Sequence, residues 1–326
     1  MRILFICGSL NQTRQLEAIA RELPGHEHLY TPYYADGLAG ALVRLGLAEM
    51  SIAGAKRRAL CLDYLRETNL PMDLDGRGGA YDLVVTSSDV IMPRNIRHAP
   101  IVAVQEGILD PERILYRACK ALPLLPRWLA GTAFTGQSGL YDRFCVASEG
   151  YRQHFVSRGA DPARVVITGI PNFDDCRRYL ENSFPHRGYA LVCTSDARET
   201  FKVDFRRRLI RRARQLAAGR QLIFKLHPNE DAERARREIA AEAPEALVFT
   251  GGSAEEMIAN CSLLITQWSS TSFVGVALGK EVISNIGGEE LRRLCPVQNG
   301  GASARNIAAV CREVAARRSP RRREAA

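Results

Sequence analysis

Short apolar runs alternate with longer amphipathic segments along the whole chain. Most of these runs lack the period-two alternation of a half-exposed sheet, which is typical of parallel strands covered on both faces. We predict strands at residues 3–7, 28–31, 83–86, 101–104, 144–147, 165–168, 190–194, 222–226, 247–250, 263–266 and 282–284. Between them, apolar residues recur at helical spacing, and we predict one such helix at 13–23.

This repeated alternation of strands and helices predicts an α/β fold with doubly wound parallel sheets. A chain of 326 residues is long enough for two domains, each with its own core. Segment 169–176 is rich in turn-forming residues, so we place the hinge there. The predicted domains are residues 1–169 and 170–326.

Composition and charge narrow the possible partners. Hydrophobic residues make up 46% of the chain and charged residues 25%, as in globular proteins. The net charge of +9 comes from arginine, which clusters at 206–214 and 317–323. Such clusters suit phosphate or an anionic membrane, although a solvated helix face and a frayed tail explain them equally simply. Neither cluster is interleaved with aromatic residues, so we predict no nucleic-acid partner.

No apolar stretch approaches the roughly 20 residues of a membrane-spanning helix, and the N-terminus begins as a strand. We therefore expect a cytoplasmic protein, with possible contact at the inner face of the membrane. Segment 114–129 mixes apolar side chains, a tryptophan and three cations, and Pro123 and Pro126 interrupt it. It suits a lipid interface, whereas the alternative is a core-packing helix followed by a loop.

The second half carries two candidate phosphate-binding segments. Lys225 and His227 end one predicted strand, and ligands of open parallel sheets bind beyond the carboxyl ends of strands. A histidine there can donate to a phosphate oxygen, or it can merely satisfy a local carbonyl. Ser269, Ser270 and Thr271 follow another strand and begin a helix, where hydroxyls and free amides favour an anion. Simple N-capping is the alternative, and it needs only one such residue.

The first half offers a loop and two carboxylates. Gly8, Ser9 and Asn11 lie between the first strand and first helix, where they could hold a phosphate or an acceptor hydroxyl. Glu106 follows strand 101–104, so it is a candidate general base whose pKa burial would raise, or a surface glutamate. Asp89 is a second candidate. The nine scattered cysteines include no CxxC pair, and we predict no metal site.

In order and spacing, three motifs resemble the GT-B superfamily of sugar-nucleotide enzymes. They are residues 166–174, including Gly169 and Pro171, residues 224–229, and residues 265–271 with 277–280 behind them. Within the superfamily they resemble the branch of CDP-glycerol glycerophosphotransferases, capsule-polysaccharide transferases and UDP-N-acetylglucosamine 2-epimerases. The first half is similar in its strand–helix layout and in Gln105-Glu106-Gly107, which lies where the epimerases have a glutamate–glycine motif.

The resemblance implies two Rossmann-like domains facing a cleft. The C-terminal domain would hold a nucleotide diphosphate sugar through Lys225, His227, Ser269, Ser270, Thr271, Gly169 and Pro171. The N-terminal domain would bind a glycan or lipid-linked acceptor, and catalysis would need no cofactor and no metal. The chain departs from the family at residues 8–14 and 86–90, where the epimerase motifs are broken, and at 105–107, where CDP-glycerol transferases have a histidine motif.

We therefore predict a glycosyltransferase of cell-surface polysaccharide or glycolipid synthesis. In this interpretation Glu106 takes the acceptor proton, Asp89 is a second acid, and His227 stabilises the departing diphosphate. The alternatives are a sugar-nucleotide 2-epimerase or hydrolase, a CDP-glycerol-type glycerophosphotransferase, and a sugar-nucleotide-binding protein without activity.

Overall fold

The predicted strands all form, and each agrees with its prediction to within one residue at either end. The computed structural model describes residues 1–46, 51–122, 125–199 and 203–323. Six strands pair in the parallel order β2-β1-β3-β4-β5-β6: β1 Arg2–Cys7, β2 Glu27–Pro32, β3 Leu83–Thr86, β4 Ile101–Val104, β5 Arg143–Val146 and β6 Val165–Ile167. Five pair in the parallel order β11-β10-β7-β8-β9: β7 Ala190–Cys193, β8 Leu222–Lys225, β9 Leu247–Phe249, β10 Leu263–Ile265 and β11 Glu281–Ile283.

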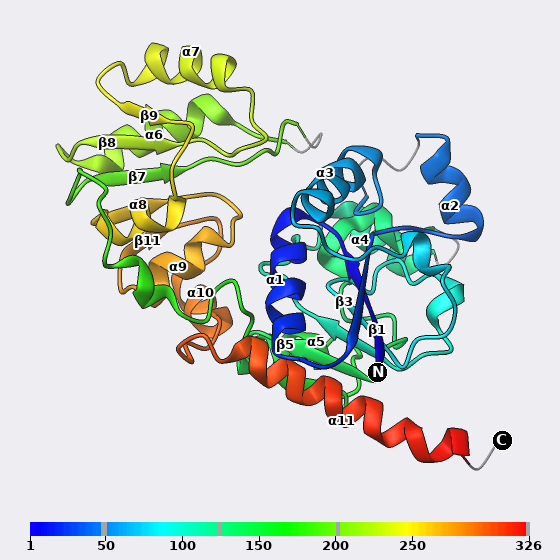
Figure 1. Ribbon diagram of the computed structural model, residues 1–326. Coiled ribbons are helices and arrows are strands. Elements are labelled where there is room, and N and C mark those ends of the chain that lie inside the picture. The colour runs from blue at the N-terminus through cyan, green and yellow to red at the C-terminus, as the bar shows by residue number, and fades with distance from the viewer. Residues whose placement is uncertain (47–50, 123–124, 200–202, 324–326) are drawn as a thin grey trace. The chain divides into compact units, whose positions relative to one another are not determined.

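Each sheet belongs to its own compact unit (Figure 1). The first unit comprises Met1–Asp174 together with Asn299–Ala326, and the second comprises Asp175–Gln298. This division corrects the sequence-based one, which assigned every residue after 169 to the second domain. The last helix, α11 Ser303–Arg323, returns to the first unit because Ile307, Cys311 and Val314 are buried against its sheet and helix α1.

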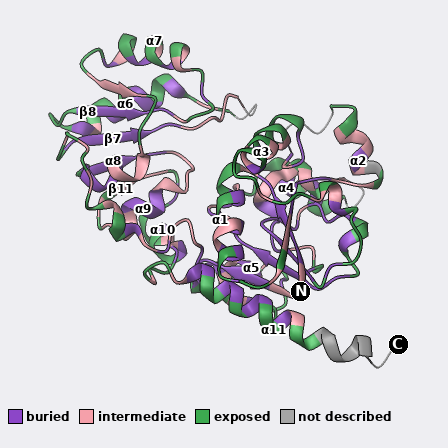
Figure 2. Ribbon diagram, viewed as in Figure 1, coloured by how far each residue is buried: buried purple, intermediate pink, exposed green. Residues whose placement is uncertain are grey.

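Helices cover both sheets. In the first unit they are α1 Leu10–Arg21, α2 Gly37–Arg44, α3 Ala55–Glu67, α4 Ile114–Ala121, α5 Glu149–Val156 and α11, with short turns η1 Leu74–Gly76, η2 Arg94–Ile96 and η3 Arg127–Phe134. In the second they are η4 Cys176–Tyr179, α6 Arg206–Ala217, α7 Ala232–Glu242, α8 Ala254–Asn260, α9 Thr271–Ala277 and α10 Gly288–Leu294. The strands in the middle of both sheets are buried (Figure 2), as their apolar runs predict.

Both sheets contain a point at which the strand order reverses. The chain begins the first sheet at β1 and places β2 on one side and β3 on the other. In the second sheet it begins at β7, adds β8 and β9 on one side, and then adds β10 and β11 on the other. Open α/β sheets bind ligands beyond the carboxyl ends of strands at such points. The loops after β1, β3, β7 and β10 are therefore candidate ligand-binding loops.

Three of the six arginines in the cluster at 206–214 form ion pairs within the protein. Arg206 is buried, and its guanidinium contacts Glu230 at 2.6 Å and Asp204 at 2.9 Å. Arg211 and Arg214 reach Glu242 and Glu245. These pairs favour the interpretation of the cluster as a structural helix face. In the second cluster only the side chain of Arg317 is described. None of the helices in the described ranges is long and apolar enough to span a bilayer.

Candidate functional site

Glu106 is held at the carboxyl end of β4, in the middle of the first sheet. The preceding residue, Gln105, is fully buried and fixes the turn through its side-chain amide. That amide donates to the carbonyl of Gly107 and accepts from the backbone N–H of Ala147, both at 2.9 Å. Because Ala147 follows β5, the amide ties the ends of two neighbouring strands together. The direction in which Glu106 leaves the sheet is thereby determined.

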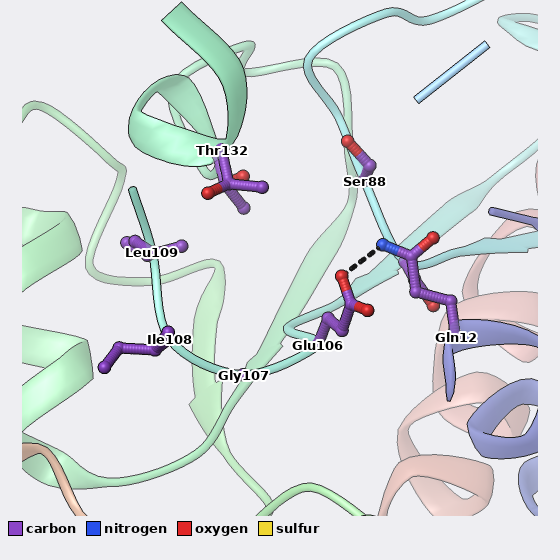
Figure 3. A pocket seen from close by; sticks show the side chains of 9 residues that line it. Gln12, Ser88, Glu106, Gly107, Ile108, Leu109 and Thr132 are labelled. Atoms are coloured by element: carbon purple, nitrogen blue, oxygen red, sulfur yellow. Dashed lines mark hydrogen bonds between the residues drawn. The ribbon is translucent and has the colours of Figure 1, made fainter. Parts of the chain in front are cut away.

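The carboxylate of Glu106 accepts two hydrogen bonds from the segment after β1. The Ser9 hydroxyl donates to one oxygen at 2.7 Å. The Gln12 amide donates to the other at 2.6 Å, and Figure 3 shows this second bond. Gln12 also closes a capping box at the start of α1, because its Oε1 accepts from the Ser9 N–H. Ser9 and Gln12 therefore hold both the helix start and the carboxylate.

Gly8 leaves room for this arrangement. A Cβ atom at position 8 would lie 1.6 Å from Oε1 of Gln12 and 2.9 Å from Ile52. No side chain fits there while Gln12 keeps its place. The predicted loop of Gly8, Ser9 and Asn11 therefore contacts Glu106 mainly through Ser9, with Gly8 providing space. The backbone oxygen of Asn11 accepts instead from the side chain of Asn172, at 3.2 Å.

Glu106 has the electrostatic properties of a group that exchanges a proton. Burial raises its pKa above the usual glutamate value, and the hydrogen bonds from Ser9 and Gln12 oppose this only in part. A raised pKa moves the carboxyl group closer to the pH at which general acids and bases work best. The structure thus fits the expected direction of the shift, and the catalytic role stays a prediction.

A small pocket opens beside Glu106 (Figure 3). Its volume is about 20 Å³, which is enough for roughly one water molecule or one hydroxyl group. The walls come from the ends of β3 and β4, from α1 and from η3: Gln12, Ser87, Ser88, Glu106, Gly107, Ile108, Leu109, Thr132 and Thr135. A reacting hydroxyl fits against the carboxylate, whereas a whole sugar ring does not fit inside this pocket.

Asp89 lies in the same unit, but its carboxylate bonds to backbone amides instead of lining the pocket. Its carboxylate is buried and accepts backbone N–H bonds from Gly136 at 2.7 Å and Ser138 at 3.0 Å. Burial raises its pKa, while these two amides lower it. Asp89 is not among the residues that line the pocket. Its bonds hold the loop that follows η3, and η3 provides one wall of the pocket.

In the second unit, the ends of three neighbouring strands meet around His227. The backbone N–H of His227, after β8, donates to the hydroxyl of Thr194, after β7, at 3.1 Å. Ser195 then donates to Gln267, after β10, at 3.4 Å. These bonds place the loops after β7, β8 and β10 beside one another, at the point where the strand order reverses.

The imidazole of His227 is oriented by its own loop. Its Nδ1 accepts from the backbone N–H of Asn229 at 3.2 Å, and it lies 4.0 Å from a carboxylate oxygen of Asp196. Because Nδ1 accepts, the neutral ring carries its hydrogen on Nε2. The side chain is partly exposed at the end of the strand, and its role in ligand binding stays a prediction.

The other predicted donor-binding residues divide into two groups. Ser269 lies on the loop after β10, Ser270 is the N-cap residue of helix α9 and Thr271 begins it, and the hydroxyls of Ser269 and Thr271 are 2.9 Å apart. Lys225, by contrast, is buried, and its ammonium group donates to the carbonyls of Leu226 and Thr250. Burial lowers its pKa. Lys225 thus links the carboxyl ends of β8 and β9 through buried hydrogen bonds.

Gly169 and Pro171 lie with the first unit, after β6. Gly169 has a φ of +74°, a conformation that favours glycine, and its carbonyl accepts from the Thr168 hydroxyl at 2.8 Å. The structure places both residues in the segment that leads to Asp174, where the chain leaves the first unit.

Sequence analysis missed several residues of these sites. Gln12 was detectable, because Ser9 and Gln12 have the S-x-x-Q spacing of a capping box. Thr132 and Thr135 gave no signal, since they are distant in sequence and meet Glu106 only through the fold. Glu230 was also missed. Its buried carboxylate pairs with Arg206 and accepts from the hydroxyl of Thr194. It thereby holds the loop after β7, which lies beside His227.

Comparison with known proteins supports the fold and gives no close relative. No protein-family model matches the sequence, and no curated protein matches it. Among solved structures, a UDP-GlcNAc 2-epimerase from Neisseria meningitidis bound to UDP-GlcNAc is similar with a TM-score of 0.58 at 11% identity, covering 96% of this chain and 100% of the other. An epimerase from Methanocaldococcus jannaschii, in complex with UDP-GlcNAc and UDP, gives 0.57 at 14% identity, with 96% and 100% covered. The wall teichoic acid polymerase TagF gives 0.53 at 11% identity, with 97% and 89% covered.

Identities this low establish the fold alone. They agree with the sequence motifs, which point to the same group of proteins. The chain therefore has two parallel-sheet α/β domains of the GT-B type, a fold that it shares with sugar-nucleotide 2-epimerases and with a teichoic acid polymerase.

Proposed function

We propose that this protein is an enzyme that acts on a nucleotide diphosphate-linked sugar and uses Glu106 as its acid–base group. The observation that carries the proposal is the carboxylate of Glu106, which lines a pocket at the carboxyl edge of the first sheet. Burial raises its pKa, and Ser9 and Gln12 fix its position. A pocket with room for one hydroxyl group suits proton transfer to or from a substrate oxygen.

The second unit supplies the groups for the nucleotide diphosphate. His227 follows β8, with Nε2 left as the donor of its neutral ring, and the hydroxyls of Ser269 and Thr271 follow β10, on the other side of β7. Donors aimed at the oxygens of a diphosphate stabilise it as negative charge develops on the leaving group. Similar solved structures that contain UDP or UDP-GlcNAc support this choice of ligand class.

Two specific reactions, epimerisation of the sugar and its transfer to an acceptor, are each favoured by one observation. Epimerisation is favoured by the comparisons, since the similar structures from Neisseria meningitidis and Methanocaldococcus jannaschii are UDP-GlcNAc 2-epimerases. Transfer of the sugar to an acceptor hydroxyl is favoured by the pocket, since Glu106 is the one carboxylate among the described residues that line it. A transferase needs one base, whereas a 2-epimerase of this type uses several carboxylates to labilise the ring proton.

Product analysis separates these reactions. The purified chain is incubated in deuterated water with UDP-, CDP- and GDP-linked sugars, with and without lipid or glycan acceptors, and the products are followed by NMR. Deuterium at the second carbon of the recovered sugar identifies an epimerase, and a new glycosidic bond identifies a transferase. Binding without turnover would identify a sugar-nucleotide-binding protein. Absence of both binding and turnover would reject the proposal.

His227→Ala tests the donor assignment by itself. Losing one hydrogen bond to a charged oxygen costs about 1.5–3 kcal/mol, so the affinity for the nucleoside diphosphate should fall by roughly 10- to 150-fold. His186→Ala is the matched control, because His186 belongs to the same unit but contacts Gln221, which precedes β8. Isothermal titration gives both affinities. Equal affinities in the two variants would remove His227 from the binding site.

A further inference from the structure

Helix α4 carries apolar side chains on its outer face as well as its inner one. Tyr116 and Cys119 point inward and pack with Ala133 and Phe134 of η3. On the other side Ile114 is 84% exposed, Leu115 is 52% exposed and Leu122, at the helix end, is 58% exposed. A single exposed leucine is ordinary, but three large apolar side chains on one short helix need a covering surface.

Positive charges border this apolar face. Arg113, Arg117 and Lys120 are exposed beside it. Within the described ranges, no carboxylate forms an ion pair with Arg113 or Arg117. The neighbouring acid, Glu112, is engaged by Arg158. The face therefore combines uncovered apolar surface with uncompensated positive charge, a combination typical of helices that lie at an anionic lipid interface.

We propose that this face of α4, defined by Ile114, Leu115 and Leu122 with Arg113, Arg117 and Lys120, docks on an anionic membrane surface. The charge argues against a second copy of the chain as the occupant. A twofold interface brings the same patch of both subunits together, so the cations of one copy would approach those of the other. Lipid phosphates attract the same cations, and the acyl region accepts the apolar side chains.

The lipid-binding face and the pocket beside Glu106 share one structural module. Helix α4 packs on η3 through Tyr116 and Phe134, and η3 carries Thr132, a wall of the pocket. Docking α4 would hold this wall close to the membrane. If the proposed function is transfer, the arrangement brings the pocket near acceptors that are anchored in lipid. This consequence rests on the proposed function, whereas docking itself does not.

Flotation of the full chain with vesicles tests the docking, without any substrate. The vesicles are phosphatidylcholine alone or phosphatidylcholine mixed with phosphatidylglycerol, at low and at high salt. We expect the wild type to float with the anionic vesicles at low salt and to dissociate at high salt. Arg117→Glu changes two unit charges, so the partition should fall on the order of 20-fold. Ile114→Ser should lower it about tenfold or more, because it removes a membrane-inserting side chain.

Two control variants match these changes elsewhere on the surface. Arg212→Glu reverses an exposed arginine of α6, and Val203→Ser removes an apolar side chain that is 69% exposed. Both should float like the wild type. Circular dichroism and nucleotide binding establish that all four variants fold. The proposal is overturned if the wild type stays with the unbound protein at low salt, if the controls lose binding equally, or if Ile114→Ser instead dissociates a dimer.

Discussion

The carboxylate of Glu106 experiences two opposed influences. Burial disfavours its charge, and the Ser9 and Gln12 side chains stabilise that charge by hydrogen bonding. The net effect raises the pKa in the folded protein above its value in the unfolded chain. A carboxyl group of this kind binds its proton more tightly when folded, so the folded state loses stability as pH rises from the usual glutamate value through the raised one. The charged form of Glu106 therefore has a cost in stability at neutral pH.

Glu106→Gln should consequently make the protein more stable at neutral pH. The amide keeps the size of the side chain and removes the penalty of the buried charge. The advantage over the wild type should shrink as pH falls through the raised pKa and should be absent below the usual glutamate pKa, since the wild-type carboxyl is then protonated in both states. Urea unfolding across this pH range measures it. The exposed Glu181→Gln is the control, and a stability gain of the same size at all pH values would contradict the explanation.

The same variant should lose activity by about 100- to 10,000-fold while keeping nucleotide affinity. In the wild type, the activity should fall as the pH drops through the raised pKa, if Glu106 acts as a base. Initial rates against pH, with the substrate found by product analysis, give this profile. Full activity in Glu106→Gln would remove it from the chemistry.

At the scale of elements, the connection between β1 and α1 links helix capping to the candidate active site. Ser9 caps α1, and Gln12 closes the capping box while donating to Glu106. Helix α1 accordingly begins at Leu10, three residues before the predicted start at Thr13. The prediction followed the apolar face of the helix, whereas the cap extends the helix backward over polar residues. One short loop thus has a structural and a proposed catalytic task.

Gly8→Ala should disturb both the capping of α1 and the positioning of Glu106. The added Cβ would collide with Oε1 of Gln12, so the Gln12 side chain must leave its place. Glu106 then loses a hydrogen bond that stabilises its charge, and its pKa should rise further. We expect the acidic limb of the pH–rate profile to move to higher pH. Gly251→Ala is the control, because no atom lies within 4 Å of a Cβ there. An unchanged profile in Gly8→Ala would show that Gln12 does not tune Glu106.

At the scale of the whole molecule, the chain ends in the unit where it began. Asp174, the last residue before the second unit, accepts the N–H of Ser303 at 2.8 Å and so holds the start of α11. Farther along the helix, Ile307, Ala308 and Cys311 are fully buried in the core of the first unit. The second unit is therefore an insertion between Asp174 and Asn299.

Ending the chain after residue 302 should unfold the first unit and spare the second. Fully burying one aliphatic side chain contributes about 1.5–3 kcal/mol, and whole domains are stable by only about 5–15 kcal/mol. Removing several such side chains exceeds what the first unit can lose. Limited proteolysis should then leave a resistant fragment of about residues 175–298. Ending the chain after residue 317 is the control, and cooperative unfolding of the first unit in the shorter chain would contradict the assignment.

The strands and the α/β class of the fold were predictable from local sequence patterns. Strands of parallel sheets are buried on both faces, so apolar runs such as 83–86 and 222–225 were recognisable without knowing their neighbours. The position of Glu106 at the end of a strand was predictable for the same reason. Both properties depend on residues that are close together in the chain. The sequence left open whether Glu106 is buried, and with it the direction of its pKa shift.

Which of these residues come into contact depends on the packing of whole elements. Ser9, Gln12 and Thr132 gather around Glu106 because β1, β4 and η3 end at one edge of the first sheet. Asp89 and Lys225 are buried and form hydrogen bonds with backbone groups, because a buried charged group without a hydrogen-bond partner is costly. The return of α11 to the first unit depends on contacts between residues almost 300 positions apart, such as Arg312 and Glu22. No local pattern encodes such contacts, because they result from how complete elements pack.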